Sequence, residues 1–189
     1  YWLAVWQGHF HCFRIKLLQN WICLLQGYLN RRPNRGLLKL KCGLMEYCDI
    51  VITCLPSPTI SAAVVDQMLP HVREGKIWLE MSTTDEAEVK RLGNMVIERG
   101  GAAVDCPVSG GCHRADTGNI SIFAGCDRAT FETVLPFLTI MGRRILHTGD
   151  LGSASVLKVI TNFLATANLV SCAEALTVAK GAGMDLGVA

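Results

Sequence analysis

The sequence predicts an α/β domain built on a mostly parallel sheet and followed by one long helix. Short apolar runs rich in β-branched residues alternate with amphipathic segments, and the connections between them are short. With 50% hydrophobic and 18% charged residues the chain is too apolar to be disordered. Its 189 residues are enough for one domain with a sizeable core.

The first run, CDIVITCL at 48–55, is continuous and β-branched, which is typical of a strand covered on both faces. Pro56 and Pro58 end this run, and the apolar residues of 59–72 then recur at helical spacing. The run KIWLE at 76–80 predicts the second strand. A strand, a helix and a strand joined this closely favour a parallel pair.

The next helix is predicted over 84–99, where an amphipathic pattern begins with several acids. Negative charge in the first turn is favoured by the helix dipole. The glycine pair at 100–101 ends this helix, and AAVDC at 102–106 predicts the third strand. GNISIFAG at 118–125 predicts the fourth.

Asp127 is predicted to cap a helix that runs to 138, and residues 143–147 predict the fifth strand. Residues 153–181 contain no proline, and no glycine before their end. They therefore predict one helix of about eight turns. We expect the apolar face of such a helix, at the edge of a domain, to be buried against something.

Basic residues are concentrated in residues 1–45, which do not follow the α/β pattern. This segment holds seven Lys or Arg and no acid, against eleven bases and sixteen acids in 46–189. Because the patterned part is net acidic, we expect no nucleic-acid partner. The longest uncharged run, 50–65, contains two prolines and is shorter than the ~20 residues of a membrane helix, so we expect no membrane partner either.

The nine cysteines lie in apolar segments and include no Cys-x-x-Cys pair. Their six-residue spacings are not those of a zinc site; Cys112 and His113 could offer ligands, but the pattern favours small buried thiols and no metal. Such thiols indicate a reducing compartment, so we expect a cytoplasmic protein. The basic start of the chain leaves mitochondrial targeting as the alternative.

One segment suited to ligand binding is DCPVSGG at 105–111. It follows a predicted strand, where open α/β sheets place their ligands. Ser109, Gly110 and Gly111 can present backbone N–H groups to a small carboxylate. The alternative interpretation is an ordinary glycine-rich turn.

A second candidate lies on the long helix, where Lys158 and Asn162 are four residues apart and share one face. Between Leu157 and Val159 the lysine should be partly desolvated, which lowers its pKa and suits it to general acid/base work. The alternatives are a snorkelling lysine and a polar asparagine on a helix surface.

Two further turns follow buried strands, Leu55 and Pro56 after the first and Ser82 and Thr83 after the second. Both are placed to line a cofactor along the strand ends. Strands also commonly end in proline or Ser/Thr turns without any ligand.

In order and spacing, four motifs resemble the β-hydroxyacid dehydrogenase family, which includes 3-hydroxyisobutyrate dehydrogenase and glyoxylate/succinic semialdehyde reductase. They are DIVITCLPSP, EMSTT, VDCPVSGG with GNISIFAGC behind it, and GSASVLKVITN. The resemblance extends from about Asn30 to the end of the chain. It implies a Rossmann-like NAD(P)-binding domain like that of 6-phosphogluconate dehydrogenase. The implied activity is that of an oxidoreductase, which interconverts a small 3-hydroxy acid and its semialdehyde or keto acid.

The resemblance also implies roles for individual residues. Lys158 matches the family's catalytic lysine and Asn162 its substrate-binding asparagine, while Ser109, Gly110 and Gly111 match the loop that holds the substrate carboxylate. The implied cofactor-binding residues are Asn30, Arg31, Leu55, Pro56 and Thr83. The cofactor is NADP or NAD, and Arg31 favours NADP because its charge suits the 2′-phosphate. The implied partners are a small carboxylate substrate and, as in the full-length family, further copies of the chain in a homo-oligomer.

Two departures from the family pattern accompany these matches. Where the family has Gly-x-Gly-x-x-Gly, this chain has WLAVWQGHFHC with Gly8 alone, so we expect residues 1–28 to be an out-of-frame or misassembled first strand and helix. We expect an NAD(P)-binding domain over 1–152, then over 153–189 an interdomain helix and the start of a helical second domain that is otherwise missing. The alternative function is a non-catalytic NAD(P)-binding pseudoenzyme, or an inactive fragment of such a dehydrogenase.

Overall fold

Three parallel strands form one half of the sheet in the computed structural model, which describes Met45 and residues 48–189. They are β1 (Ile50–Thr53), β2 (Ile77–Glu80) and β3 (Ala102–Asp105), and each lies within a run that predicts a strand. Because all three are parallel, their carboxyl ends meet at one edge of the sheet. The predictions for residues 1–28 lie outside the described residues.

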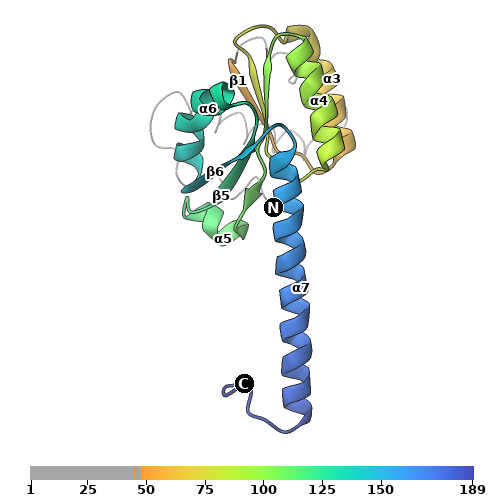
Figure 1. The fold of residues 1–189 in the computed structure, drawn as a ribbon, viewed down its shortest axis with the longest axis vertical. Helices are drawn as coiled ribbons and strands as arrows, with labels where there is room; N and C mark the ends of the chain where they lie inside the picture. The colour runs from red at the N-terminus through yellow and green to blue at the C-terminus, as the bar shows by residue number, and fades with distance from the viewer. Residues whose placement is uncertain (1–44, 46–47) are drawn as a thin grey trace, which may run out of the picture.

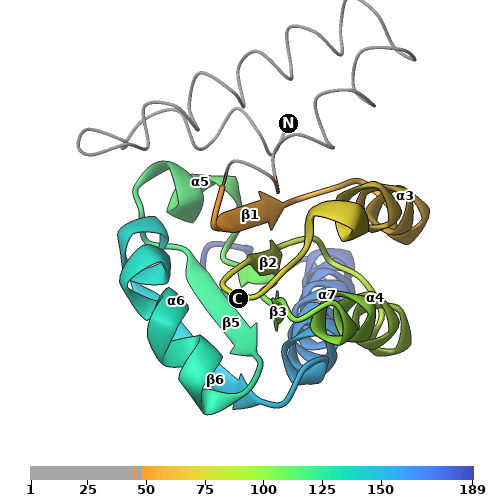
Figure 2. The same cartoon turned by 90° about the horizontal axis from the view of Figure 1, so that it is seen from above.

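Two helices cover one face of these strands (Figure 2). They are α3 (Pro58–Met68), which the short 3₁₀ helix η2 (Leu69–His71) continues, and α4 (Glu86–Glu98). Ser57 and Asp85 cap the first turns of α3 and α4 with their own side chains. Buried residues of both helices pack around Trp78 of β2, which is 1% exposed.

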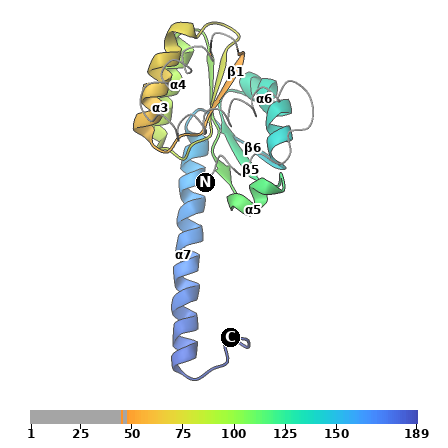
Figure 3. The same cartoon turned by 180° about the vertical axis from the view of Figure 1, so that it is seen from behind.

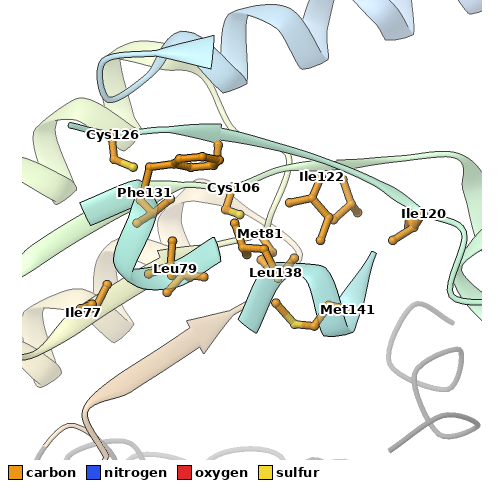
Figure 4. Close-up of a cluster of buried hydrophobic side chains, with 14 residues drawn as sticks. Ile77, Leu79, Met81, Cys106, Ile120, Ile122, Cys126, Phe131, Leu138 and Met141 are labelled. Atoms are coloured by element: carbon orange, nitrogen blue, oxygen red, sulfur yellow. The ribbon is translucent and has the colours of Figure 1, made fainter. Parts of the chain in front are cut away.

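The opposite face of the sheet carries a second apolar cluster, shown in Figure 4. Because side chains alternate along a strand, Trp78 faces α3 and α4, whereas Ile77 and Leu79 belong to this second cluster. Helix α6 (Arg128–Met141) contributes Phe131 and Leu138 to it. Burial on both faces explains why the strand runs in the sequence are continuously apolar.

Beyond β3 the sheet becomes mixed. The short strand β4 (Val108–Ser109) pairs antiparallel with β5 (Ser121–Gly125), which also meets the end of β3 antiparallel and runs parallel to β6 (Arg144–Gly149). Helix α5 (Gly111–Asp116) connects β4 to β5. The sequence predicts neither β4 nor α5, because elements of two and six residues are too short to show a period.

The long helix α7 (Ser153–Gly181) has the bounds that the sequence predicts. Figures 1 and 3 show it leaving the sheet domain and projecting well beyond it. Only Ala154, Ser155 and Lys158 in it are buried. Length and mean hydropathy alone would allow α7 to cross a membrane. Its first turns, however, pack against the sheet, with a lysine among their buried residues.

The described cysteines depart in part from the expected small buried thiols. Cys106 and Cys126 are buried, whereas Cys54, Cys112 and Cys172 are exposed. Burial raises the pKa of Cys126 to about 12, so this thiol stays protonated at neutral pH. Among the described residues, no three His, Cys, Asp or Glu side chains gather into a group that could hold a metal ion.

Candidate active site

A hydrogen bond joins the loops that follow β1 and β2, at the carboxyl edge of the sheet. The Leu55 N–H donates to Ser82 Oγ at 2.7 Å, which ties the first loop to the second. Pro56 and Thr83 are exposed on these loops, and Leu55 is half-buried. Three of the residues predicted to bind a cofactor therefore lie on two linked loops at one edge of the sheet.

A buried carboxylate that the sequence reasoning missed supports these loops. Glu80, only 1% exposed, accepts the Ser82 N–H at 2.8 Å and the Thr53 hydroxyl at 2.9 Å, and Thr53 in turn accepts the Trp78 Nε1–H. Burial raises the pKa of Glu80, although its hydrogen bonds oppose that shift. In the sequence this glutamate ends the run KIWLE, which is the position of an ordinary solvent-exposed strand end. The signal that could have identified it as buried is its place in a strand that is covered on both faces.

The same edge contains a hydroxyl without a partner. Thr84 is 7% exposed, and its Oγ1 makes no hydrogen bond within the described part of the chain. A buried hydroxyl of this kind indicates a missing partner such as a ligand or an ordered water. The edge therefore fits part of a dinucleotide site. Asn30 and Arg31, which the sequence assigns to the same cofactor, lie outside the described residues.

The glycine-rich segment forms the end of β4 and the start of α5. Ser109 is half-buried in β4, while Gly110 and Gly111 are exposed. Both glycines have positive φ, +134° and +72°, which L side chains rarely adopt. No atom lies within 4 Å of a Cβ built at Gly111, so the backbone there is open to a ligand.

Lys158 and Asn162 lie in different surroundings on α7. Lys158 is 9% exposed, and burial lowers its pKa, as its apolar neighbours predict. No described acid forms an ion pair with it. Asn162, one turn further along, is exposed. An unpaired, desolvated amine gives up its proton more readily than a solvated lysine does, which suits it to general acid/base work.

The glycine-rich segment and the lysine helix meet at a contact that spacing alone did not reveal. The Asp105 carboxylate, at the end of β3, accepts the Ser155 N–H at 2.6 Å and the Ser155 hydroxyl at 2.7 Å. Ser109 follows Asp105 by four residues and Lys158 follows Ser155 by three. The structure thus joins the two segments that the sequence selected, through a pair of residues 50 positions apart.

Known proteins resemble this chain over the same segments. Residues 37–149 match the family described as the NAD binding domain of 6-phosphogluconate dehydrogenase. A 2-(hydroxymethyl)glutarate dehydrogenase of Eubacterium barkeri is 32% identical over 139 residues, which are 72% of this chain and 46% of the relative. A probable mitochondrial 3-hydroxyisobutyrate dehydrogenase of Dictyostelium discoideum is 30% identical over 83% of this chain and 50% of the relative.

A solved structure agrees with these relatives. The 3-hydroxyisobutyrate dehydrogenase of Mycobacterium tuberculosis, described with L-serine, matches with a TM-score of 0.73 and 25% identity over 76% of this chain and 50% of its own. The chain spans about half the length of the relatives that it matches. Since the matched domain covers more than half of the chain, the protein belongs to the family of the 6-phosphogluconate dehydrogenase NAD-binding domain, together with the β-hydroxyacid dehydrogenases.

Proposed function

We propose that this protein is an NAD(P)-dependent oxidoreductase that interconverts a small 3-hydroxy acid and its semialdehyde or keto acid. The observation that carries the proposal is Lys158, which is buried without a described acid partner on a helix fixed to the glycine-rich segment. The similarity to hydroxyacid dehydrogenases supports the same reaction class.

In the proposed reaction, Lys158 handles the proton. When bound, NAD(P)H supplies a hydride to the substrate carbonyl carbon. The Lys158 ammonium donates a proton to the resulting alkoxide during reduction, and the neutral amine removes it during oxidation. Burial lowers the pKa of Lys158, which makes the neutral amine easier to form than in a solvated lysine. Ser109, Gly110 and Gly111 hold the substrate carboxylate, and Asn162 binds the substrate from the next turn of α7.

The proposed cofactor site uses the loops at the carboxyl edge. Leu55, Pro56 and Thr83 line it on the side of the described strands, and Asn30 and Arg31 complete it. We assign NADP as the preferred cofactor because a guanidinium at Arg31 would bind the 2′-phosphate. The proposed domain division is a cofactor-binding domain over 1–152 and an interdomain helix with its continuation over 153–189. A homo-oligomer in the cytoplasm remains our proposal for the assembly and its location.

Cofactor binding and turnover test this proposal separately. NADPH and NADH fluorescence is titrated with the wild-type chain, Arg31→Ala and Lys158→Met, followed by turnover of a panel of 3-hydroxy acids and semialdehydes. We expect saturable binding that favours NADPH, weakens in R31A and persists in K158M, with turnover lost in K158M. Absence of binding overturns the proposal. Binding without turnover in the wild type supports instead the alternative of a non-catalytic NAD(P)-binding protein.

A further inference from the structure

Helix α7 begins without a cap of its own. Its N-cap residue, Gly152, has a φ of +92° and no side chain to accept a first-turn N–H. Asp105, at the end of β3, supplies the missing acceptor through its two bonds to Ser155. A side chain from the sheet therefore caps a helix that begins 48 residues later in the chain.

This way of beginning a helix is costly compared with the way that α3, α4 and α6 begin. Helices α3, α4 and α6 are capped by local residues, Ser57, Asp85 and Asp127. Asp105 is 0% exposed, and no described lysine or arginine forms an ion pair with it. Burying an unpaired carboxylate is unfavourable, so initiating α7 does not by itself account for this arrangement.

The start of α7 also lies close to the sheet. A Cβ at Gly125, the β5 residue that pairs with Asp105, would come within 2.9 Å of Ser153 Oγ and of the Asp150 carbonyl. Ser155 itself is 1% exposed. The first turn of α7 is therefore held closely against the sheet, and the Thr148 hydroxyl of β6 also shares a hydrogen bond of 2.7 Å with the Ser153 hydroxyl. Further along α7, Lys158 is its last buried residue.

Both segments of the proposed site extend from this attachment. Ser109 lies four residues beyond Asp105, about 13 Å along an extended chain. Lys158 lies three residues beyond Ser155, about 4.5 Å along a helix, and Asn162 about 10.5 Å along it. Sliding α7 by a single turn would move Lys158 by about 5.4 Å relative to Ser109. The Asp105–Ser155 contact is the one that joins the two segments directly, so it contributes to their register.

We infer that Asp105 is a positioning residue, which acts through Ser155 to place the Lys158 amine relative to the carboxylate-binding loop at Ser109. The inference rests on the function proposed above and adds a residue to the same site. Asp105 itself touches neither the substrate nor the cofactor in this scheme. Its contribution is to keep Lys158 buried and at a fixed distance from the loop.

The test compares Ser155→Ala with Asp105→Asn. S155A leaves one carboxylate oxygen unpaired, whereas D105N retains both contacts, since the Asn oxygen accepts the Ser155 N–H and its amide donates to the Ser155 hydroxyl. The matched control is Thr130→Ala, because Thr130 gives the same two bonds, from its N–H and its hydroxyl, to the capping Asp127 of α6. All variants are made in the 189-residue chain.

Two readouts separate positioning from stability. One is the titration of Lys158, followed by NMR of the ¹³C-methylated amine, and the other is the kcat and KM of reduction. We expect S155A to move the Lys158 pKa up toward the ordinary 10.5 and to lower kcat about tenfold, while NADPH affinity changes less than twofold. D105N and T130A should leave both readouts near those of the wild type.

Each outcome decides one question. If the Lys158 pKa and the kcat of S155A match those of T130A, the inference is wrong even though the proposed function stands. If D105N behaves as badly as S155A, geometric positioning by the two hydrogen bonds is also wrong. If the wild type turns over no substrate, the proposed function fails, and the Lys158 titration still shows whether the Asp105–Ser155 contact places the lysine.

Discussion

Burial of Lys158 prepares its amine for proton transfer and at the same time destabilises the fold. Its pKa is lowered because desolvation disfavours the charged form. Lys158→Met removes that penalty, so we expect K158M to raise the free energy of unfolding by about 1 kcal/mol at pH 7 while abolishing turnover. Thermal and urea denaturation measure the first effect. Lys180→Met, on the exposed end of the same helix, is the control and should stay within about 0.5 kcal/mol of the wild type.

The stability advantage of K158M over the wild type should decrease as the pH rises. With a folded pKa below the unfolded 10.5, the unfolded state binds more protons between the two values. The stability of the wild type therefore rises with pH across that window, and its difference from K158M shrinks as the pH approaches 10.5. A difference that stays constant from pH 7 to pH 10.5 would show that Lys158 titrates normally.

Glu80 holds the ends of β1 and β2 and should respond differently to truncation and to neutralisation. Glu80→Ala leaves the buried Ser82 N–H without its acceptor, removes the shorter hydrogen bond of the Thr53 hydroxyl and opens a cavity, and we expect a loss of about 2–3 kcal/mol in urea unfolding. Glu80→Gln keeps an acceptor for Ser82, and the Thr53 hydroxyl can turn to the Leu79 carbonyl, 3.4 Å away. We expect E80Q to lose less than about 1 kcal/mol.

The pKa of Glu80 predicts a second difference between E80Q and the wild type. Burial raises this pKa above its ordinary 4.5, so the folded state holds the proton more tightly than the unfolded state does. The wild type therefore loses stability relative to E80Q as the pH rises above 4.5. Unfolding measured from pH 4 to pH 8 checks the sign. A free energy of unfolding that rises in the wild type relative to E80Q over this range would contradict the prediction.

At the scale of elements, the junction of β4 and α5 offers a controlled test of the carboxylate loop. Gly111→Ala places a side chain at a φ of +72° in open space, and Gly118→Ala does the same at +67° after α5. Both substitutions should lower the free energy of unfolding by about 1–2 kcal/mol, because the backbone strain is the same at the two positions. We expect only G111A to raise the KM for a carboxylate substrate. An equal rise in G118A would show that strain alone, and not the loop, determines KM.

Elements with a clear period could be predicted from the sequence, and contacts between distant residues could not. The long helix has its predicted bounds because 29 residues without proline carry many turns of pattern. The helix predicted to end at 138 extends to Met141, whose side chain packs in the core, because helix ends are poorly marked in a periodic pattern. Desolvation of Lys158 followed from its neighbours. The Asp105–Ser155 contact and the Glu80 bonds depend on strand order, which a single sequence does not state.

On the scale of the whole molecule, the sheet domain and α7 bury very different shares of their apolar residues. The sheet has a closed cluster on each face. Beyond Lys158, α7 instead exposes large apolar side chains, among them Phe163 (69%) and Leu169 (71%). Apolar surface of this extent is expected to be covered in solution.

We expect the 189-residue chain to cover this surface by self-association. Sedimentation velocity over a range of concentrations should show species larger than the monomer. Phe163→Glu combined with Leu169→Glu should shift the population toward monomer, because charge opposes burial of the face. Ile140→Glu, at an exposed apolar residue of α6 (60%), is the matched control and should leave self-association unchanged. A wild type that sediments as a monomer at every concentration would show that the exposed face of α7 does not bind a second copy of the chain.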